Sequence, residues 1–357
     1  MTDIRERAEK ALRKIYAELE AEGPDGLPAL MSGRAGKALF KFHYLKYQGA
    51  SDITKRLGKE VHLIAEAAAT YPNRTFCSGT SGIRWFYRFL ADRQMLEDPQ
   101  LGGFLPEEAL EMLEKGNYDF LHGAIGLAHA FLLDAKRPPE SFFLRFLASL
   151  KKQRTSDLSL AHGLASILKF CLECYNAGLC RMEAGEMAWD LIQYLLDHVN
   201  EDTELSYFPG ARLAWCNGDL GIGYVLYQAG MTFGDPMLID FAMGVLRHAA
   251  GRRGYRRTRV SDGALCHGAA GVAHIFGKIA HKTGDSLFRE AADYWIEMTL
   301  AWGFHLDVRS GYKKYNPATQ MFEPDTSLLE GSAGIGLVLL SYITGDFGWD
   351  ACLLLND

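Results

Sequence analysis

Two cysteines and a histidine stand at matching places in two short motifs, WCNGDLG and LCHGAAG. Cys216 lies in the first motif, and the adjacent residues Cys266 and His267 lie in the second. Two thiols and an imidazole make three of the four ligands that a tetrahedral zinc ion prefers, and a catalytic zinc site keeps its fourth position open. Neighbours on a helix point about 100° apart, so Cys266 and His267 can share a metal only from a turn ahead of a helix. We therefore expect a Zn2+ site built on two such turns.

The types of these ligands favour one kind of chemistry. Zinc deprotonates a thiol that coordinates it, and two protein thiolates already balance the charge of the ion. A third thiolate, from a substrate, would make the complex anionic and keep that sulfur electron-rich. A site richer in histidine would polarise water better. The ligand set therefore favours activation of a substrate thiol over hydrolysis.

The turn pattern itself occurs seven times along the chain. Each copy places a G-x-x-G turn ahead of an apolar stretch, and the copies follow one another at intervals of 40 to 63 residues, the range of a two-helix repeat. In the fourth copy Ser166 replaces the second glycine. The first glycines of the seven copies are Gly33, Gly79, Gly123, Gly163, Gly218, Gly268 and Gly331.

The stretches around these turns predict the fold. The apolar run after each turn is typical of a helix buried on most sides, and the more amphipathic run ahead of it is typical of an outer helix. An open solenoid would need a polar capping repeat, but the last copy is as apolar as the middle ones. The sequence therefore predicts an all-α fold, an α/α toroid (barrel) of seven inner and seven outer helices in one domain over residues 1–357, without a strand pattern. Besides the N-terminal helix, we expect outer helices at 56–70, 106–115, 140–152, 186–199, 236–250 and 286–302.

Closure of the ring would bring three more polar residues to the metal. His162 precedes Gly163 in the register of His267, Asp119 stands four residues before Gly123, and Arg212 four before Cys216. They supply an acid or base, a carboxylate to orient it, and a fixed cation for a developing anion. His122 occupies the same register as His162 and competes with it for the proton-transfer role.

Other cysteines and histidines fit structural roles better. Cys77 shares the register of Cys216, but we expect it in the core and not as a fourth ligand. We also expect structural roles for Cys171, Cys174, Cys180, His129 and His274. The long loops ahead of copies five to seven are expected to form a rim around the metal, with a Tyr-, Gly-, Lys- and Pro-rich loop at 304–326.

Composition narrows the remaining classes of function. The chain of 357 residues is 48% hydrophobic and 23% charged, with a net charge of −6, which gives no reason to expect nucleic-acid binding. No apolar run is long enough to insert into a membrane, and the charged start is unlike a signal peptide. Seven cysteines without an export signal predict free thiols and a cytoplasmic protein. The basic run RRGYRRTR is expected to be a solvated loop, or a surface that attracts an acidic peptide.

The two cysteine motifs and the five other turns resemble the LanC family of lanthipeptide cyclases, also called lanthionine synthetase C-like proteins, over essentially the whole chain. The resemblance implies an α/α toroid with one zinc ion on Cys216, Cys266 and His267. It also implies catalytic roles for His162, Asp119 and Arg212. Cyclases of this family add peptide cysteine thiols to dehydroalanine or dehydrobutyrine, which closes (methyl)lanthionine thioether rings in a ribosomally made precursor peptide. The implied partners are the dehydrated precursor, leader plus core, and a dehydratase and a transporter of a biosynthetic complex.

Two features of the chain depart from the family, and other functions compete. Asn217 stands where the family often has an aromatic residue, and the chain has little room for an inserted peptide-binding subdomain. A LanC-like enzyme that adds glutathione to dehydrated residues is one alternative. A catalytically silent peptide-binding scaffold is another. A zinc-dependent protein prenyltransferase also uses an α/α ring, but the seven G-x-x-G turns fit it poorly.

Overall fold

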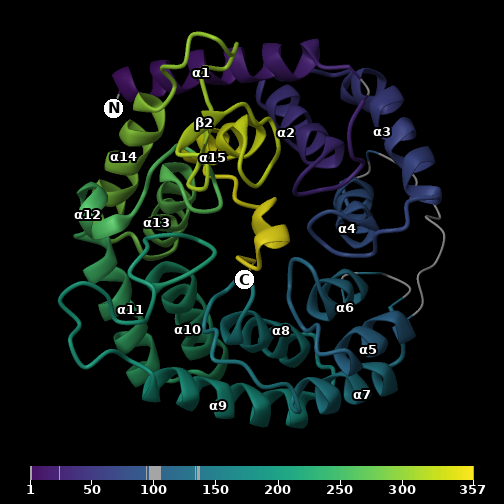
Figure 1. Ribbon diagram of the computed structural model, residues 1–357, viewed down its shortest axis with the longest axis vertical. Coiled ribbons are helices and arrows are strands. Elements are labelled where there is room, and N and C mark those ends of the chain that lie inside the picture. The colour runs from purple at the N-terminus through teal and green to yellow at the C-terminus, as the bar shows by residue number, and fades with distance from the viewer. Residues whose placement is uncertain are drawn as a thin grey trace.

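The computed structural model describes residues 2–23, 25–93, 95, 106–132, 134 and 137–356. Fourteen of the helices within these residues form two concentric rings (Figure 1). The inner ring consists of α2 (Arg34–Tyr47), α4 (Thr80–Ala91), α6 (Ala124–Leu132), α8 (Leu164–Asn176), α10 (Asp219–Phe233), α13 (Ala269–Thr283) and α15 (Ser332–Thr344). The outer ring consists of α1 (Thr2–Ala21), α3 (Ile53–Ala69), α5 (Pro106–Glu114), α7 (Glu140–Leu150), α9 (Arg181–Asp197), α11 (Pro236–Ala250) and α14 (Ser286–Ala301). This arrangement confirms the predicted α/α toroid of seven inner and seven outer helices.

Backbone hydrogen bonds join the turns that precede the inner helices. Each bond connects residues that stand two positions before the first glycine of their copies. The N–H of Leu329 donates to the carbonyl oxygen of Met31 at 3.0 Å, which links the last copy to the first and is possible only in a closed ring. The other bonds run from Met31 to Cys77, Cys77 to Leu121, Ala161 to Cys216, Cys216 to Cys266, and Cys266 to Leu329.

The second glycine of the motif allows each inner helix to pack against its own turn. A Cβ atom at Gly271 would lie 1.8 Å from the carbonyl oxygen of Leu265, and one at Gly334 would lie 1.9 Å from that of Leu328. Close approach of the backbone, and not a left-handed φ, therefore excludes a side chain at these two positions. In the fourth copy the hydroxyl of buried Ser166 donates to the carbonyl oxygen of Gly163 at 2.7 Å.

Most outer helices agree with their predicted bounds to within three residues. The exception is α9, which begins at Arg181 and not at residue 186. Gly185 lies inside this helix, where a Cβ atom would be 3.2 Å from the ring of Tyr175. None of the described helices is both long enough and apolar enough to span a membrane.

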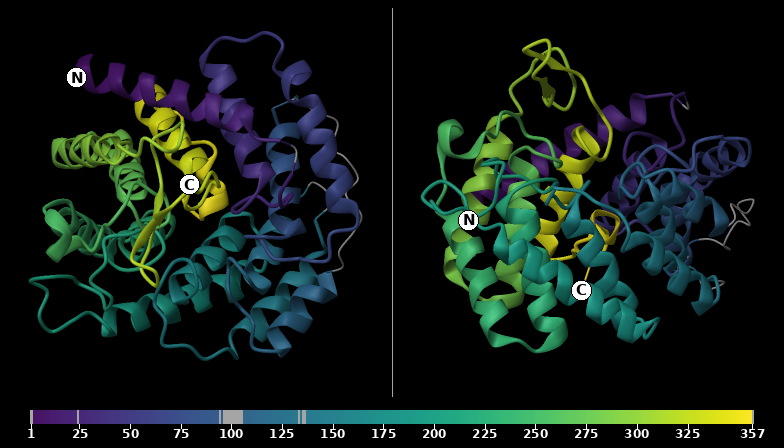
Figure 2. Two further views of the ribbon diagram at one scale, coloured as in Figure 1. Left: turned by 45° about the horizontal axis from the view of Figure 1, so that its top comes forward. Right: turned by 60° about the horizontal axis from the view of Figure 1, so that its bottom comes forward.

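The chain also contains a short β-hairpin, for which the sequence showed no strand pattern. The loop between α14 and α15 contains β1 (Lys314–Asn316) and β2 (Met321–Glu323), which pair antiparallel with Tyr315 opposite Phe322. Strands of three residues are too short to produce a recognisable alternation of polar and apolar residues. The loop projects from the ring (Figure 2).

The C-terminal segment fills the centre of the ring. Beyond α15 the chain turns back inward and forms the 3-10 helix η1 (Asp350–Leu353) (Figure 1). The buried carboxylate of Asp350 accepts two hydrogen bonds from Lys278 Nζ at 2.7 Å and lies 2.9 Å from His274 Nε2. The indole N–H of Trp215 donates to the carbonyl oxygen of Leu353 at 2.9 Å. These contacts join the last residues of the chain to α13 and to the turn before α10.

The substitution Asp350→Ala should lower the stability of the protein. It would leave the ammonium group of Lys278 buried without its carboxylate, which costs about 3–5 kcal/mol in comparable buried pairs. Urea unfolding followed by circular dichroism should show a lower midpoint than for the wild type. Asp240→Ala, which removes an exposed carboxylate from α11, is the control and should leave the midpoint nearly unchanged. Equal midpoints for the two variants would contradict this account of the C-terminal segment.

Candidate metal centre and its surroundings

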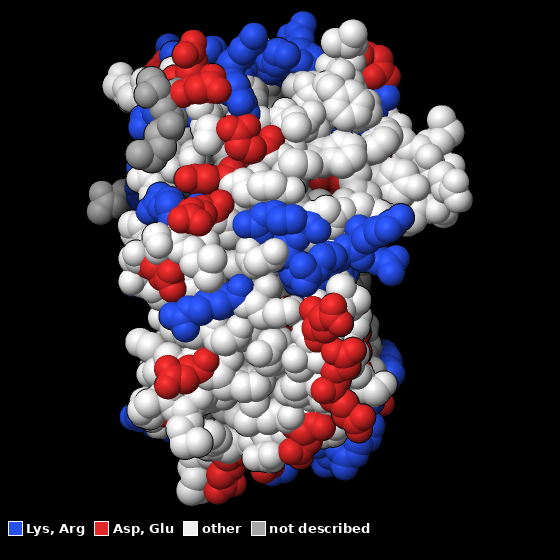
Figure 3. Space-filling view, turned by 90° about the vertical axis from the view of Figure 1, so that its left-hand side faces the viewer, with Lys and Arg blue, Asp and Glu red and all other residues white. Residues whose placement is uncertain are grey.

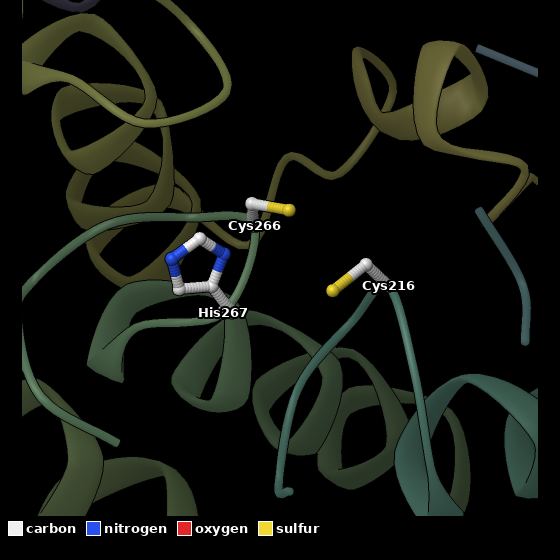
Figure 4. Close-up of side chains that lie close together, drawn as sticks. All are labelled: Cys216, Cys266 and His267. Carbon is white, nitrogen blue, oxygen red and sulfur yellow. The ribbon is translucent and has the colours of Figure 1, made fainter. Parts of the chain in front are cut away.

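The side chains of Cys216, Cys266 and His267 converge at the mouth of the ring (Figure 4). Cys216 comes from the turn before α10, and the other two come from the turn before α13. Their ligand atoms all lie within 4.8 Å of one another. A tetrahedral zinc ion would hold such atoms about 3.6–3.8 Å apart, so small side-chain rotations would close the site around an ion. Within the described part of the chain, this is the one cluster of His, Cys, Asp or Glu side chains spaced to hold a metal.

The charges in this cluster also suit a cation. A hydrogen bond from the Cys266 thiol, aided by one from His267, lowers the pKa of the Cys216 thiol to about 5 against the opposing effect of burial. The anionic sulfur of Cys216 and burial together raise the pKa of Cys266. The pKa of His267 is raised, chiefly by its hydrogen bond to Cys216. These shifts favour a thiolate at Cys216 beside a thiol at Cys266, and a divalent cation would suit both sulfurs in place of the thiol proton.

Asp119 and His162 form a hydrogen-bonded pair across two neighbouring turns. Asp119 Oδ2 lies 2.5 Å from His162 Nδ1, and Asp119 Oδ1 accepts the backbone N–H of His122 at 2.7 Å. The bond to Asp119 is the main cause that raises the pKa of His162. Burial raises the pKa of Asp119, but the hydrogen bonds from His162 and His122 outweigh it and lower that pKa. Both pKa shifts favour an imidazolium beside a carboxylate. The His162 side chain is 44% exposed.

His122 and His162 occupy the same register, but only His162 meets Asp119 through its ring. The ring of His122 lies parallel to that of His162, with centroids 6.1 Å apart. His122 bonds to Asp119 through its main-chain N–H. The geometry thus distinguishes two histidines that the sequence pattern leaves equivalent.

Arg212 occupies a position that serves a different purpose in other copies. Six residues before the first glycine, three copies have an aspartate whose carboxylate accepts the N–H two residues further on, at 2.8–3.0 Å. In copy five Arg212 takes this place, and Gly218 has a φ of +84°. Arg212 helps to lower the pKa of Cys216, which places its positive charge near that sulfur. The three aspartates are Asp157, Asp262 and Asp325.

The segment that carries Arg212 is held by buried groups. The Arg252 guanidinium, fully buried, donates to the carbonyl oxygen of Ala211 and pairs with buried Asp219 at 3.3 Å. The N–H of Leu213 donates to the carbonyl oxygen of Thr258 at 2.8 Å. Arg252 begins the basic run that the sequence analysis placed in a solvated loop, so that expectation is wrong for this residue.

Glu330 is a polar residue of the mouth that the sequence analysis did not single out. It precedes Gly331 in the register of His267, and its carboxylate lies 2.8 Å from Lys314 Nζ. Lys314 also pairs with Asp325 at 3.0 Å, and these carboxylates raise its pKa. The N–H of Tyr315 donates to Asp262 at 2.9 Å. The hairpin is therefore attached to turns six and seven, and the repeat register alone would have identified Glu330.

Several other cysteines and histidines named in the sequence analysis are outside the metal cluster. Cys77 is buried and outside the group of converging ligands. His129 pairs with Glu173 at 2.8 Å in the core, and His274 pairs with Asp350. Cys171, Cys174 and Cys180 are buried free thiols. These positions agree with packing roles.

Comparisons with known proteins place this architecture in a family. The family described as lanthionine synthetase C-like protein matches the chain over residues 26–354. Among solved structures, one named nisin cyclase superposes with a TM-score of 0.71 at 16% identity, covering 99% of this chain and 98% of that chain. No curated protein matches the sequence. Because the family match spans nearly all of the chain, this protein belongs to the lanthionine synthetase C-like family.

Proposed function

We propose that this protein is a zinc-dependent lanthionine synthetase. It would add cysteine thiols of a ribosomally made peptide to dehydroalanine or dehydrobutyrine in the same peptide and so form (methyl)lanthionine rings. The observation that carries the proposal is the convergence of two sulfurs and a nitrogen within 4.8 Å, at the mouth that also holds the Asp119–His162 pair. Membership of the family supplies the class of reaction.

In this proposal each residue at the mouth has its own role in the reaction. Cys216, Cys266 and His267 would hold a zinc ion, whose positive charge would keep a substrate thiol deprotonated near neutral pH. The substrate sulfur bonds to the alkene β-carbon, and the π electrons move toward the α-carbon and its carbonyl, giving an enolate. The guanidinium of Arg212 offsets the charge of that enolate. His162 then donates a proton to the α-carbon, while Asp119 holds the imidazolium in place.

The proposed partners follow from this chemistry. The alkenes in the substrate have to be made before the cyclase acts, so a dehydratase that eliminates water from serine and threonine must supply the peptide. We propose that the substrate is a precursor with leader and core segments, and that a transporter in the same complex exports the product. We propose that the reaction takes place in the cytoplasm, where peptide thiols stay reduced.

Zinc binding should depend on the cysteines of the cluster. The variants Cys216→Ala and Cys266→Ala should lose nearly all the zinc that the wild type carries, about one ion per chain, because two remaining ligands hold the ion weakly. Metal analysis of purified protein checks this. Cys77→Ala removes a buried thiol outside the cluster and should keep its zinc. Full zinc content in either cluster variant would contradict the proposed ligands.

The substitution His162→Ala should stop ring closure without loss of zinc. Cyclisation does not change the peptide mass, but a cysteine in a ring resists alkylation by iodoacetamide, so mass spectrometry after alkylation measures the reaction. Loss of the general acid should slow ring closure about 10²- to 10⁴-fold. His122→Ala is the matched control, and its rate should stay within a few-fold of the wild type. If the His162→Ala enzyme closes rings at the wild-type rate, His162 is not the general acid. If the peptide gains mass only when glutathione is added, the enzyme adds glutathione and does not cyclise the peptide.

The pH dependence of the reaction should report the Asp119–His162 pair. His162 must be protonated to act as an acid, so the rate falls as the pH rises through its raised pKa. Asp119→Asn removes the main cause of that rise, and the fall should begin at a lower pH than in the wild type. Profiles of kcat/KM between about pH 5 and 9 test this. An unchanged alkaline limb would mean that His162 is not the group that titrates.

A further inference from the structure

A short helix and the residue after it expose three arginines that have no ion-pair partner among the described residues. In α12 (Gly254–Thr258) Arg256 and Arg257 are exposed, and Arg259 follows the helix, also exposed. Tyr255, which precedes Arg256, is 60% exposed. No ion-pair partner for these three guanidinium groups lies in the described part of the chain. Three unpaired positive charges on a protein of net charge −6 form a surface for an anionic ligand.

The same segment is anchored firmly to the body of the protein. Arg252, just before α12, is buried and pairs with Asp219, and the Arg253 guanidinium lies over the ring of Tyr294, 4.4 Å from its centroid. The basic run thus divides into two arginines that fix the backbone and three that face solvent. A fixed backbone reduces the conformational entropy that a ligand must remove when it binds.

This surface lies next to the proposed reaction site. The carbonyl oxygen of Thr258, the last residue of α12, accepts the N–H of Leu213, the residue after Arg212. Thr258 also precedes Cys266 by eight residues, a span of at most about 28 Å even for a fully extended chain. A peptide docked on α12 could therefore reach the sulfurs with only a short extended segment.

The surroundings of the surface limit the length of its ligand. On this side of the molecule Lys and Arg gather in a band across the middle, with Asp and Glu both above and below it (Figure 3). The loop after α9 exposes Glu201, Asp202 and Glu204, and the carbonyl oxygen of Glu204 lies 3.1 Å from His248 Nε2 at the end of α11. A long polyanion such as nucleic acid would meet these carboxylates. A short segment with a few carboxylates would not.

We infer that Tyr255, Arg256, Arg257 and Arg259, here called the arginine surface, dock an acidic segment of the peptide substrate that lies outside the reacting residues. Each guanidinium can bind one carboxylate through two hydrogen bonds, and the exposed residue Tyr255 next to Arg256 offers apolar contact. The identity of the ligand as substrate rests on the proposed function. The affinity of the surface for an acidic peptide does not.

Binding of a labelled peptide tests the inference directly. The probe is a short fluorescent peptide with three glutamates among glycine and serine, and its counterpart has three glutamines instead. Fluorescence anisotropy should show that the wild type binds the glutamate peptide, that salt weakens the binding, and that the glutamine peptide does not bind. The double variant R256Q/R257Q should bind the glutamate peptide about tenfold more weakly.

A matched variant controls for net charge. R13Q/K14Q removes the same charge from exposed positions of α1 and should bind the glutamate peptide as the wild type does. Equal affinity for R256Q/R257Q and the wild type, or no binding by the wild type, would overturn the inference. Tighter binding of a poly-uridine oligonucleotide than of the glutamate peptide would also overturn it.

Kinetics separate this inference from the proposed function. With a dehydrated peptide that carries an acidic segment, R256Q/R257Q should raise KM about tenfold and leave kcat unchanged, since the arginine surface lies outside the reacting groups. Equal KM values for the variant and the wild type would overturn the docking role and leave the cyclase intact. If no dehydrated peptide is cyclised, the proposed function fails, and the anisotropy measurements still decide whether the surface binds acidic peptides.

Discussion

Backbone hydrogen bonds join six of the seven pairs of neighbouring turns and fix the level at which the inner helices begin. Each joins residues two positions before a first glycine, so that position and the next one recur at one level around the mouth. Cys216 and Cys266 are neighbours for this reason, although fifty residues separate them in the sequence. All seven inner helices begin at this level, and their N-terminal dipoles favour negative charge there. The backbone of the ring by itself thus creates an electrostatic environment at the mouth that favours thiolates.

The C-terminal segment supports the turns of the cluster from inside the ring. Trp215 precedes Cys216, and its indole N–H is bonded to Leu353, so the turn that carries the sulfur rests on the last residues of the chain. Asp350 ties the same segment to α13, the helix that follows Cys266 and His267. Packing in the interior therefore acts on both turns of the cluster. The position of the ligands depends on residues far from the mouth as well as on the motifs themselves.

The sequence was sufficient to predict the repeat and the closed ring, because both depend on a pattern repeated seven times. The same register predicted that Cys216, Cys266 and His267 would lie together. Features that occur once were harder to predict. The hairpin at Tyr315 has strands of only three residues, and the inward course of the chain near Asp350 has no counterpart in other copies. The choice between His122 and His162 depends on the direction of a side chain, which a shared register does not determine. Burial of Arg252 depends on Asp219, a partner more than thirty residues away.

The position of Arg212 suggests how such a ring acquires chemistry. Where Asp157, Asp262 and Asp325 stabilise their turns with a carboxylate, copy five has an arginine, and its turn is held instead by Arg252 and Thr258 from the following segment. Because Arg252 and Thr258 hold this turn, no aspartate is needed at position 212. The position can therefore carry an arginine, whose positive charge lies near the sulfur of Cys216. The arginine surface belongs to the same following segment. In the turn that bears Cys216, residues of the following segment thus take over the work that an aspartate of the turn itself does in copies four, six and seven.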